Sequence, residues 1–271
     1  MLSFRRSKVI GFFFLVIGTI LLFSGFFNHL FLIKFGPNNS WVGEFLEVNY
    51  SNFSSEFISI GITVLVINSI LEREQQNREW KNLAIQMGSV NNGDALTAIK
   101  RLEADGLLVS GFLSGRSFPG ANLENALLSG ALMERCDFDN CILSGANLSR
   151  SNLKHSTLRR AKLILTNLES ADLKWVNLNN AELLGCELSR ADLENANLRN
   201  CNLKNALVTD EQLSKVASLR GATMPSGERY NGRFNLPGDL NEYQSLKSQK
   251  TAGEIHEFFY VPKEIYERGQ Y

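Results

Sequence analysis

Two long apolar runs lie in the first third of the chain. The run at 9–27 contains nineteen residues and no charge, and a second run at 57–71 contains fifteen residues. At 1.5 Å per residue, a helix over the first run would extend about 28 Å, close to the ~30 Å hydrocarbon core of a bilayer. We therefore predict two transmembrane helices, at about residues 9–30 and 54–71. The alternatives are a cleaved signal peptide for the first run and a buried strand for the second.

Charged residues beside these runs predict their orientation. Arg and Lys precede the first run and follow the second, whereas the segment between them carries mainly Glu. Because basic flanks stay on the cytoplasmic side, the hairpin at 1–71 is predicted to cross the cell membrane with both termini of the chain in the cytoplasm. Trp41 and Tyr50 in the connecting loop favour the membrane surface, which indicates a short loop rather than an external domain. Asn28 and His29 are expected at the outer interface.

A cytoplasmic connector at 72–106 shows two amphipathic patterns. Apolar positions along 71–87 predict a helix that continues out of the bilayer with one apolar stripe. The spacing over 94–105 predicts a second, short helix, with Asp94 capping its first turn and Gly106 just beyond its end. This helix would cover the first turn of the domain that follows, where an open β edge would invite aggregation.

A period of five residues governs the chain from 107 to 208. Each fifth position from Leu113 to Val208, twenty positions in all, is apolar, and sixteen of them are Leu. Neither the 3.6-residue period of a helix nor the two-residue period of a strand puts every fifth residue on one side, so the backbone must turn once per unit. Four units per turn predict a square coil of twenty residues, with very short β segments stacked about 4.8 Å apart. Five such coils would enclose a shaft of Leu side chains.

Small residues occupy the position two before each central apolar residue. Ten of the twenty are Ala, and all four cysteines fall at this position, namely Cys136, Cys141, Cys186 and Cys201. Because this position is expected to point inward, the cysteines are predicted to fill the core rather than to form disulfides or bind metal. Asn and Asp recur between the small and the central residue, where their side chains favour turns.

The repeated runs A-N-L-E-N, A-D-L-K-W and A-D-L-E-N resemble the pentapeptide-repeat proteins, whose consensus is A-(D/N)-L-x-x. The resemblance covers about residues 108–208 and implies a mainly β fold, a right-handed quadrilateral β-helix. The segment after the repeat resembles the ending of bacterial members, and the two spans resemble membrane-anchored members of cyanobacterial type. Gyrase-directed members are understood as acidic DNA mimics, and the net charge of +1 over 111–208 argues against that role.

The last segment, 209–271, is predicted to close the coil with helices. Thr209 and Gln212 make a capping-box pattern that predicts a helix over 210–219. An irregular arm then leads to one or two helices that include Glu254–Arg268, whose apolar side is expected to pack on the shaft or to meet a partner. The complete prediction is a β-helix solenoid with an N-terminal two-helix transmembrane hairpin and α-helical caps.

Composition and charge exclude several functions. The chain is 44% hydrophobic and 21% charged, and its 28 basic residues balance its 28 acidic residues. This neutrality argues against a nucleic-acid partner. The sequence contains no glycine-rich phosphate loop, no paired Cys or His motif and no nucleophile elbow, so we expect no enzyme activity, cofactor, metal or small-molecule substrate.

Outward residues twenty apart should lie above one another, which groups them into columns. The candidate partner surface consists of an apolar cluster on one face and a basic cluster on its neighbour: Ile164, Leu165 and Leu184, and Arg159, Arg160 and Arg199. Our leading hypothesis is a membrane-tethered scaffold that presents a rigid β-helix to an unidentified protein, or to a second copy, in the cytoplasm. The alternative is a regulator or transport accessory that acts through its membrane hairpin, with the β-helix as a stabilising element.

Overall fold

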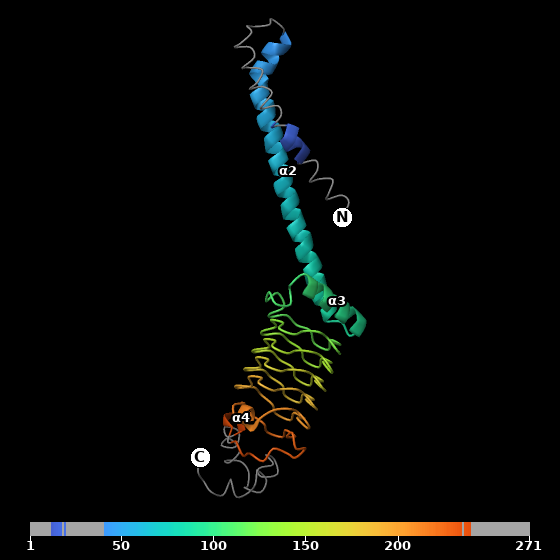
Figure 1. Ribbon diagram of the computed structural model, residues 1–271, viewed down its shortest axis with the longest axis vertical. Helices are drawn as coiled ribbons and strands as arrows, with labels where there is room; N and C mark the ends of the chain where they lie inside the picture. The colour runs from blue at the N-terminus through green and yellow to red at the C-terminus, as the bar shows by residue number, and fades with distance from the viewer. Residues whose placement is uncertain (1–11, 18, 20–40, 235, 240–271) are drawn as a thin grey trace, which may run out of the picture. The chain divides into compact units, whose positions relative to one another are not determined.

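Helix α2, Trp41–Met87, is one helix of 47 residues in the computed structural model, which describes residues 12–17, 19, 41–234 and 236–239 (Figure 1). The chain divides into two compact units, Met1–Glu79 and Trp80–Tyr271. Helix α2 contains the second apolar run, so the strand alternative for that run is wrong. The helix begins earlier than predicted, because Trp41 and Tyr50 lie within it rather than in a loop. The sequence has no proline between Trp41 and Met87 to interrupt the hydrogen-bond ladder.

The first apolar run is helical where the structure describes it, at residues 12–17 and 19. Phe14 in this run stacks on Phe57 of helix α2, with ring centroids 5.9 Å apart and an interplanar angle of 12°. The two apolar runs therefore meet at this point. The remainder of the first run, including Asn28 and His29, lies outside the described residues.

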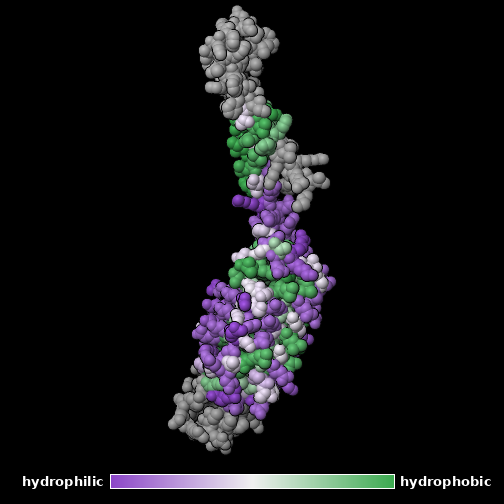
Figure 2. All heavy atoms as spheres, in the orientation of Figure 1, coloured by the Kyte–Doolittle hydropathy of each residue, from purple (hydrophilic) through white to green (hydrophobic). Residues whose placement is uncertain are grey.

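Helix α2 has one packed stripe and a broad exposed apolar surface over the second run. Gly61 and Asn68 are buried and lie seven residues apart, which places them on one face of the helix. The apolar side chains around the other faces are about half exposed; they are Ile60, Ile62, Val66, Ile67, Ile70 and Leu71. Figure 2 shows a hydrophobic band over helix α2. By its length and composition, the segment Ser55–Met87 is able to cross a membrane.

Helix α3, Asn92–Ala104, is the short connector helix that the sequence predicts, but its N-cap is not the predicted residue. Asn91 is its N-cap, and the Asn91 side chain accepts a hydrogen bond of 2.9 Å from Gly93 N. Asp94 is therefore not the cap, although it lies in the first turn, where a carboxylate interacts favourably with the helix dipole. The predicted glycine follows the helix end, since Gly106 adopts a φ of +70°.

Helix α3 closes one end of the repeat domain. Its buried residues Ala95, Ala98, Ile99 and Leu102 belong to the same hydrophobic core as the shaft. The first coil also has partners for its edge: Asn122 N donates to Ser89 O at 2.9 Å, and the side chain of Asn92 donates to Glu124 O at 3.0 Å. The exposed β edge that would invite aggregation is thus covered.

The repeat domain is the square coil that the five-residue period predicts. Fifteen parallel bridges join residues twenty apart, from Ser117↔Asp137 to Glu187↔Leu207. Every central residue from Leu113 to Leu203 is at most 2% exposed. Near the α3 end the shaft holds aromatic residues instead of Leu, with Phe118 and Phe138 stacked at a centroid distance of 5.2 Å. Each coil thus has four sides of five residues around an apolar interior.

The last residue of each five-residue unit, which we call the corner residue, adopts a left-handed backbone conformation. From Gly115 to Asn205 all nineteen corner residues have φ between +56° and +73°. Eleven of them are Asn or Gly, the residues that tolerate this region best. The next residue closes the turn by donating to the central carbonyl, as Ala121 N does to Phe118 O at 3.1 Å. Each corner is therefore a tight turn with a positive φ in its third position.

Asn and Asp before the central residues make the turn bonds that the sequence predicts. At ten such positions the side-chain Oδ1 accepts from the backbone N–H two residues later. Asn147, for example, accepts from Ser149 N at 3.1 Å. These bonds satisfy amide groups that would otherwise lack partners beside the corner.

The four cysteines are buried and free, at the inward position that the sequence predicts. Each thiol donates to a central carbonyl of the neighbouring coil, as Cys201 Sγ does to Leu178 O at 2.8 Å. Ser156 and Thr166 make the same contact with their hydroxyl groups at 2.8 Å. Burial raises the pKa of Cys136 to about 11 and those of the other three thiols to about 12.

The end of the repeat domain differs from the prediction. Helix α4 spans only Asp210–Leu213, although its capping box at Thr209 is present as predicted. A helix over 210–219 is therefore wrong, because the chain returns to the coil and pairs Asn197 with Ser218 and Asn202 with Thr223, an offset of twenty-one residues. The register shifts by one residue at helix α4, which lies where the repeat would otherwise place a corner. The predicted helix at Glu254–Arg268 lies outside the described residues.

The buried thiols should resist modification in the folded chain. At about pH 8 a thiol with a pKa of 11 or above is ionised to about one part in a thousand or less, and the thiolate is the reactive form. We expect a maleimide to label none of the four cysteines in the native full-length chain and all four after denaturation, measured by intact mass. Rapid native labelling of Cys136 or Cys201 would contradict the inward register. A cysteine placed at the exposed corner residue Asn205 serves as the positive control.

Candidate functional site: the outer faces of the coil

Outward side chains of the repeat domain form columns in which neighbours are one coil apart. We call the side that carries 139–140, 159–160 and 179–180 the arginine face, and the next side, with 164–165 and 184–185, the aliphatic face. The coils stack through parallel bridges between residues twenty apart, which sets a rise of about 4.8 Å between neighbouring side chains in a column. Outward side chains that are twenty residues apart in the sequence are therefore neighbours on the surface.

The predicted apolar cluster is present on the aliphatic face. Leu165 N donates to Leu184 O at 2.9 Å, and Ile164 and Leu184 are half-buried. Leu165 is a corner residue with φ of +57° and is 69% exposed. Its side chain lies over Gly185, where an added Cβ would come within 2.9 Å of it. The half-buried Ile142 belongs to the same face and was missed because it occupies the bridge position, which is polar in most units.

Arg159 in the predicted basic cluster is committed to an ion pair. Its Nε donates to Asp139 at 2.7 Å, its Nη2 pairs with the same carboxylate, and its backbone N–H donates to Asp139 at 2.9 Å. Thr157 also donates to Asp139. Burial by itself would raise the pKa of Asp139, but the hydrogen bonds from Arg159 and Thr157 outweigh burial and hold this pKa below its usual range. Arg159 therefore neutralises a largely buried carboxylate.

Arg199 is also engaged within the chain. Its Nε donates to Ser218 Oγ at 3.0 Å, and its Nη2 donates to Gly238 O at 2.9 Å. Gly238 N in turn donates to Ala217 O at 2.9 Å. Arg199 thus fastens the segment around Gly238 to the last coil. Arg159 and Arg199 lie at outward positions, but both have partners within the chain, which the repeat pattern does not show.

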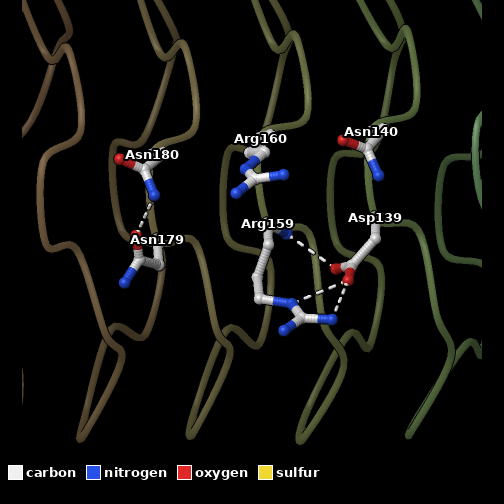
Figure 3. Close-up of a pocket in the computed structure, with 6 residues that line it drawn as sticks. All are labelled: Asp139, Asn140, Arg159, Arg160, Asn179 and Asn180. Atoms are coloured by element: carbon white, nitrogen blue, oxygen red, sulfur yellow. Dashed lines mark hydrogen bonds and ion pairs between the residues drawn. The ribbon is translucent and has the colours of Figure 1, made fainter.

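Arg160 is the remaining member of the basic cluster. It is an exposed corner residue with φ of +57°. Its backbone N–H donates to Asn179 O at 3.0 Å, but within the described residues its side chain makes no hydrogen bond or ion pair. It lies in a shallow depression of 280 Å³ whose lining comes from three successive coils: Asp139, Asn140, Arg159, Arg160, Asn179 and Asn180. Figure 3 shows Arg160 between Asn140 and Asn180 in one column, with Arg159 turned toward Asp139.

A third surface feature was not predicted. The corner residues His155 and Trp175 stack one coil apart, with ring centroids 6.2 Å apart and an interplanar angle of 18°. Trp175 is 53% exposed and has a φ of +60°, an unusual conformation for a bulky residue. The separation of twenty residues between these two rings was the feature of the sequence that could have predicted the stack. In the part of the chain that the structure describes, no cluster of three or more His, Cys, Asp or Glu residues could hold a metal ion.

Family comparisons agree with the geometry of the coil. A model described as "Pentapeptide repeat region" matches residues 131–208, and one described as "Pentapeptide repeats (8 copies)" matches residues 113–145. No curated protein matches the chain.

Solved structures of several repeat proteins resemble part of the chain. A pentapeptide repeat protein from the thylakoid lumen of Arabidopsis thaliana is 26% identical over 43% of this chain and 81% of its own, with a TM-score of 0.39. HetL of Nostoc sp. strain PCC 7120, involved in heterocyst differentiation regulation, is 34% identical over 42% of this chain, with a TM-score of 0.33. This chain spans 55% of HetL. Rfr23 of Cyanothece 51142 is 25% identical over 44% of this chain and 90% of its own, with a TM-score of 0.36.

The Asp139–Arg159 pair should make stability depend on pH. Because the pKa of Asp139 is lowered in the folded chain, its contribution is complete above the unfolded value of about 4 and is lost as pH falls through the folded value. Asp139→Asn should therefore lower the melting temperature by a constant amount between about pH 5 and 8, and by less below about pH 4. The measurement is thermal unfolding by circular dichroism.

Asp172→Asn is the matched control for this experiment. Asp172 is a half-buried aspartate of the same domain without an ion pair in the described residues, and an Asn at this position can keep the hydrogen bond that its Oδ1 accepts from Lys174 N at 3.1 Å. A larger loss of stability for Asp172→Asn than for Asp139→Asn at neutral pH would show that the pair contributes nothing of its own.

Proposed function

Residues 113–208 form a pentapeptide-repeat domain, and from this premise we propose that the chain is a membrane-tethered scaffold. The repeat domain presents a rigid surface for protein–protein interaction on the cytoplasmic side, and the N-terminal hairpin, with two spans, holds it at the cell membrane. Repeat domains of this kind are generally non-enzymatic interaction modules. The observation that carries the proposal is the exposed apolar band of helix α2. Soluble proteins rarely expose an apolar surface of this extent to water.

The distribution of polar residues around helix α2 supports a lipid environment for the band. Six of the nine exposed positions of the second run are Ile, Val or Leu, and the other three are the uncharged Ser59, Thr63 and Ser69, whereas the larger polar residue Asn68 is buried in the packed stripe. A soluble helix would have the opposite arrangement, with polar residues outside. The basic residues that flank both runs support an orientation with both termini in the cytoplasm.

The coil supports the scaffold role by its construction. Its shaft is filled by apolar residues with a structural task, so the five-residue units differ mainly in their outward side chains, corner residues included. Two of the outward columns carry side chains that the fold does not need, the aliphatic cluster and Arg160. A stiff rod with a variable surface is suited to binding, as in other solenoid proteins.

Membrane tethering is tested by placing charge on the exposed band. The double variant Ile62→Lys, Val66→Lys changes side chains that are about half exposed, so it should leave packing intact while adding an insertion cost of about 5 kcal/mol or more. The wild-type chain should remain in the membrane pellet after alkaline carbonate extraction, and a larger share of the double variant, which keeps only the first span unchanged, should move to the supernatant.

The control for this fractionation is Gln75→Lys with Gln76→Lys, which adds the same charge on helix α2 beyond the apolar band. It should stay in the pellet. Release of the wild-type chain by carbonate, or equal release of both double variants, would exclude an integral tether.

Asn68 supports a second candidate function, a regulator or transport accessory that acts through its hairpin. Asn68 is 6% exposed, and its Nδ2 has no hydrogen-bond partner in the described residues. An unpaired buried amide costs about 1–3 kcal/mol, and polar residues retained inside membrane spans commonly serve function.

The two candidates differ in their response to Asn68→Leu. This change removes an unsatisfied polar group, so it should raise the melting temperature of the detergent-solubilised chain. Under the hairpin hypothesis the variant should also fail to complement a deletion strain, although it is stable and membrane-bound. Full complementation by Asn68→Leu would leave the scaffold as the only candidate of the two.

A further inference from the structure

The depression around Arg160 has one uncompensated positive charge. Its only carboxylate, Asp139, already accepts two hydrogen bonds from the guanidinium of Arg159, one from its backbone and one from Thr157. The two charges of that pair cancel, and the other lining residues are Asn. The guanidinium of Arg160 therefore supplies the whole net charge of the depression.

The position of Arg160 is not explained by the fold. Corner residues need only a positive φ, and on the arginine face the corner residues of neighbouring coils are Asn140, Asn180 and Asn200, which adopt the same conformation at less cost than Arg. The side chain of Arg160 contributes no hydrogen bond or ion pair within the described residues. Its planar group, with five N–H donors, is left available to an outside ligand (Figure 3).

We propose that Arg160 binds a carboxylate side chain of a partner protein, in an acidic segment laid along the arginine face. The proposal rests on the scaffold function and specifies the chemistry of its partner. A guanidinium binds a carboxylate with two parallel hydrogen bonds, and a single net charge matches a monoanion. Asn140 and Asn180, one coil to either side, offer amide donors and acceptors to the backbone of such a segment.

The test measures binding of a fluorescent hexaglutamate peptide to the full-length chain in nonionic detergent, by fluorescence anisotropy. Arg160→Asn installs the residue that the neighbouring coils carry, so the corner keeps its conformation while the charge is lost. We expect this variant to weaken binding about tenfold. Arg160→Lys keeps the charge but loses the bidentate geometry, so it should weaken binding by a smaller factor.

The matched control is Arg150→Asn. Arg150 is also an exposed corner residue, with the same φ of +57° as Arg160, but it lies on a different face of the coil. It should change the affinity less than twofold. A hexaglutamine peptide should not bind any form of the chain, and the melting temperature of Arg160→Asn should match that of the wild-type chain.

Three outcomes would overturn the proposal. Equal weakening by Arg160→Asn and Arg150→Asn would show diffuse electrostatic attraction, and equal binding of the glutamine peptide would show that the carboxylate is not recognised. Displacement by inorganic phosphate at concentrations where acetate has no effect would assign the site to a phosphoryl group instead. None of these outcomes affects carbonate extraction of the wild-type chain, so this proposal and the membrane tether fail separately.

Discussion

The left-handed backbone at the corner of each five-residue unit is the constraint on which the repeat domain depends. A positive φ at nineteen successive corners turns the chain after every side, so that residues twenty apart meet in parallel bridges. That register sends every central residue into the shaft. Asn and Gly accept this conformation readily, whereas Leu165 and Trp175 adopt it at a cost of about 1–2 kcal/mol each. The stacked bridges above and below hold such residues in place.

A coil built this way has two open ends, and the chain covers both of them. At one end Ser89, Asn92 and helix α3 provide partners for the first coil. At the other end helix α4 interrupts the period, and a last partial coil pairs with an offset of twenty-one. Arg199 then joins that coil to the segment at Gly238. The stability of the domain therefore depends on these irregular ends as well as on the regular shaft.

Charge on the outer surface is used largely by the fold itself. Asp139 is nearly buried and needs Arg159, and Arg199 holds the C-terminal segment. Because these arginines have internal partners, the net charge of the domain is a poor guide to what it binds. Arg160 is a corner residue whose side chain has no hydrogen bond or ion pair within the described residues, which leaves its guanidinium available to a partner.

The sequence by itself determined the coil, because a five-residue period admits few backbone solutions. The inward direction of Leu168, the burial of Cys201 and the turn bonds of Asn147 all followed from that period. Residues with a fixed place in a short repeat have nearly identical surroundings in each unit, so one inference applies to all of them. The same reasoning failed for 210–219, where one inserted residue let the chain resume the coil with a shifted register instead of extending helix α4.

Only the tertiary structure decided which surface groups have partners and where helix α2 begins. Arg159 and Arg199 occupy the same position of the repeat unit, and their side-chain partners come from residues 19 to 39 positions away in the chain. The Trp41 end of helix α2 could not be predicted, because a polar segment without proline is compatible with either loop or helix. Long-range hydrogen bonds and packing select between such alternatives, and a local pattern carries no information about them.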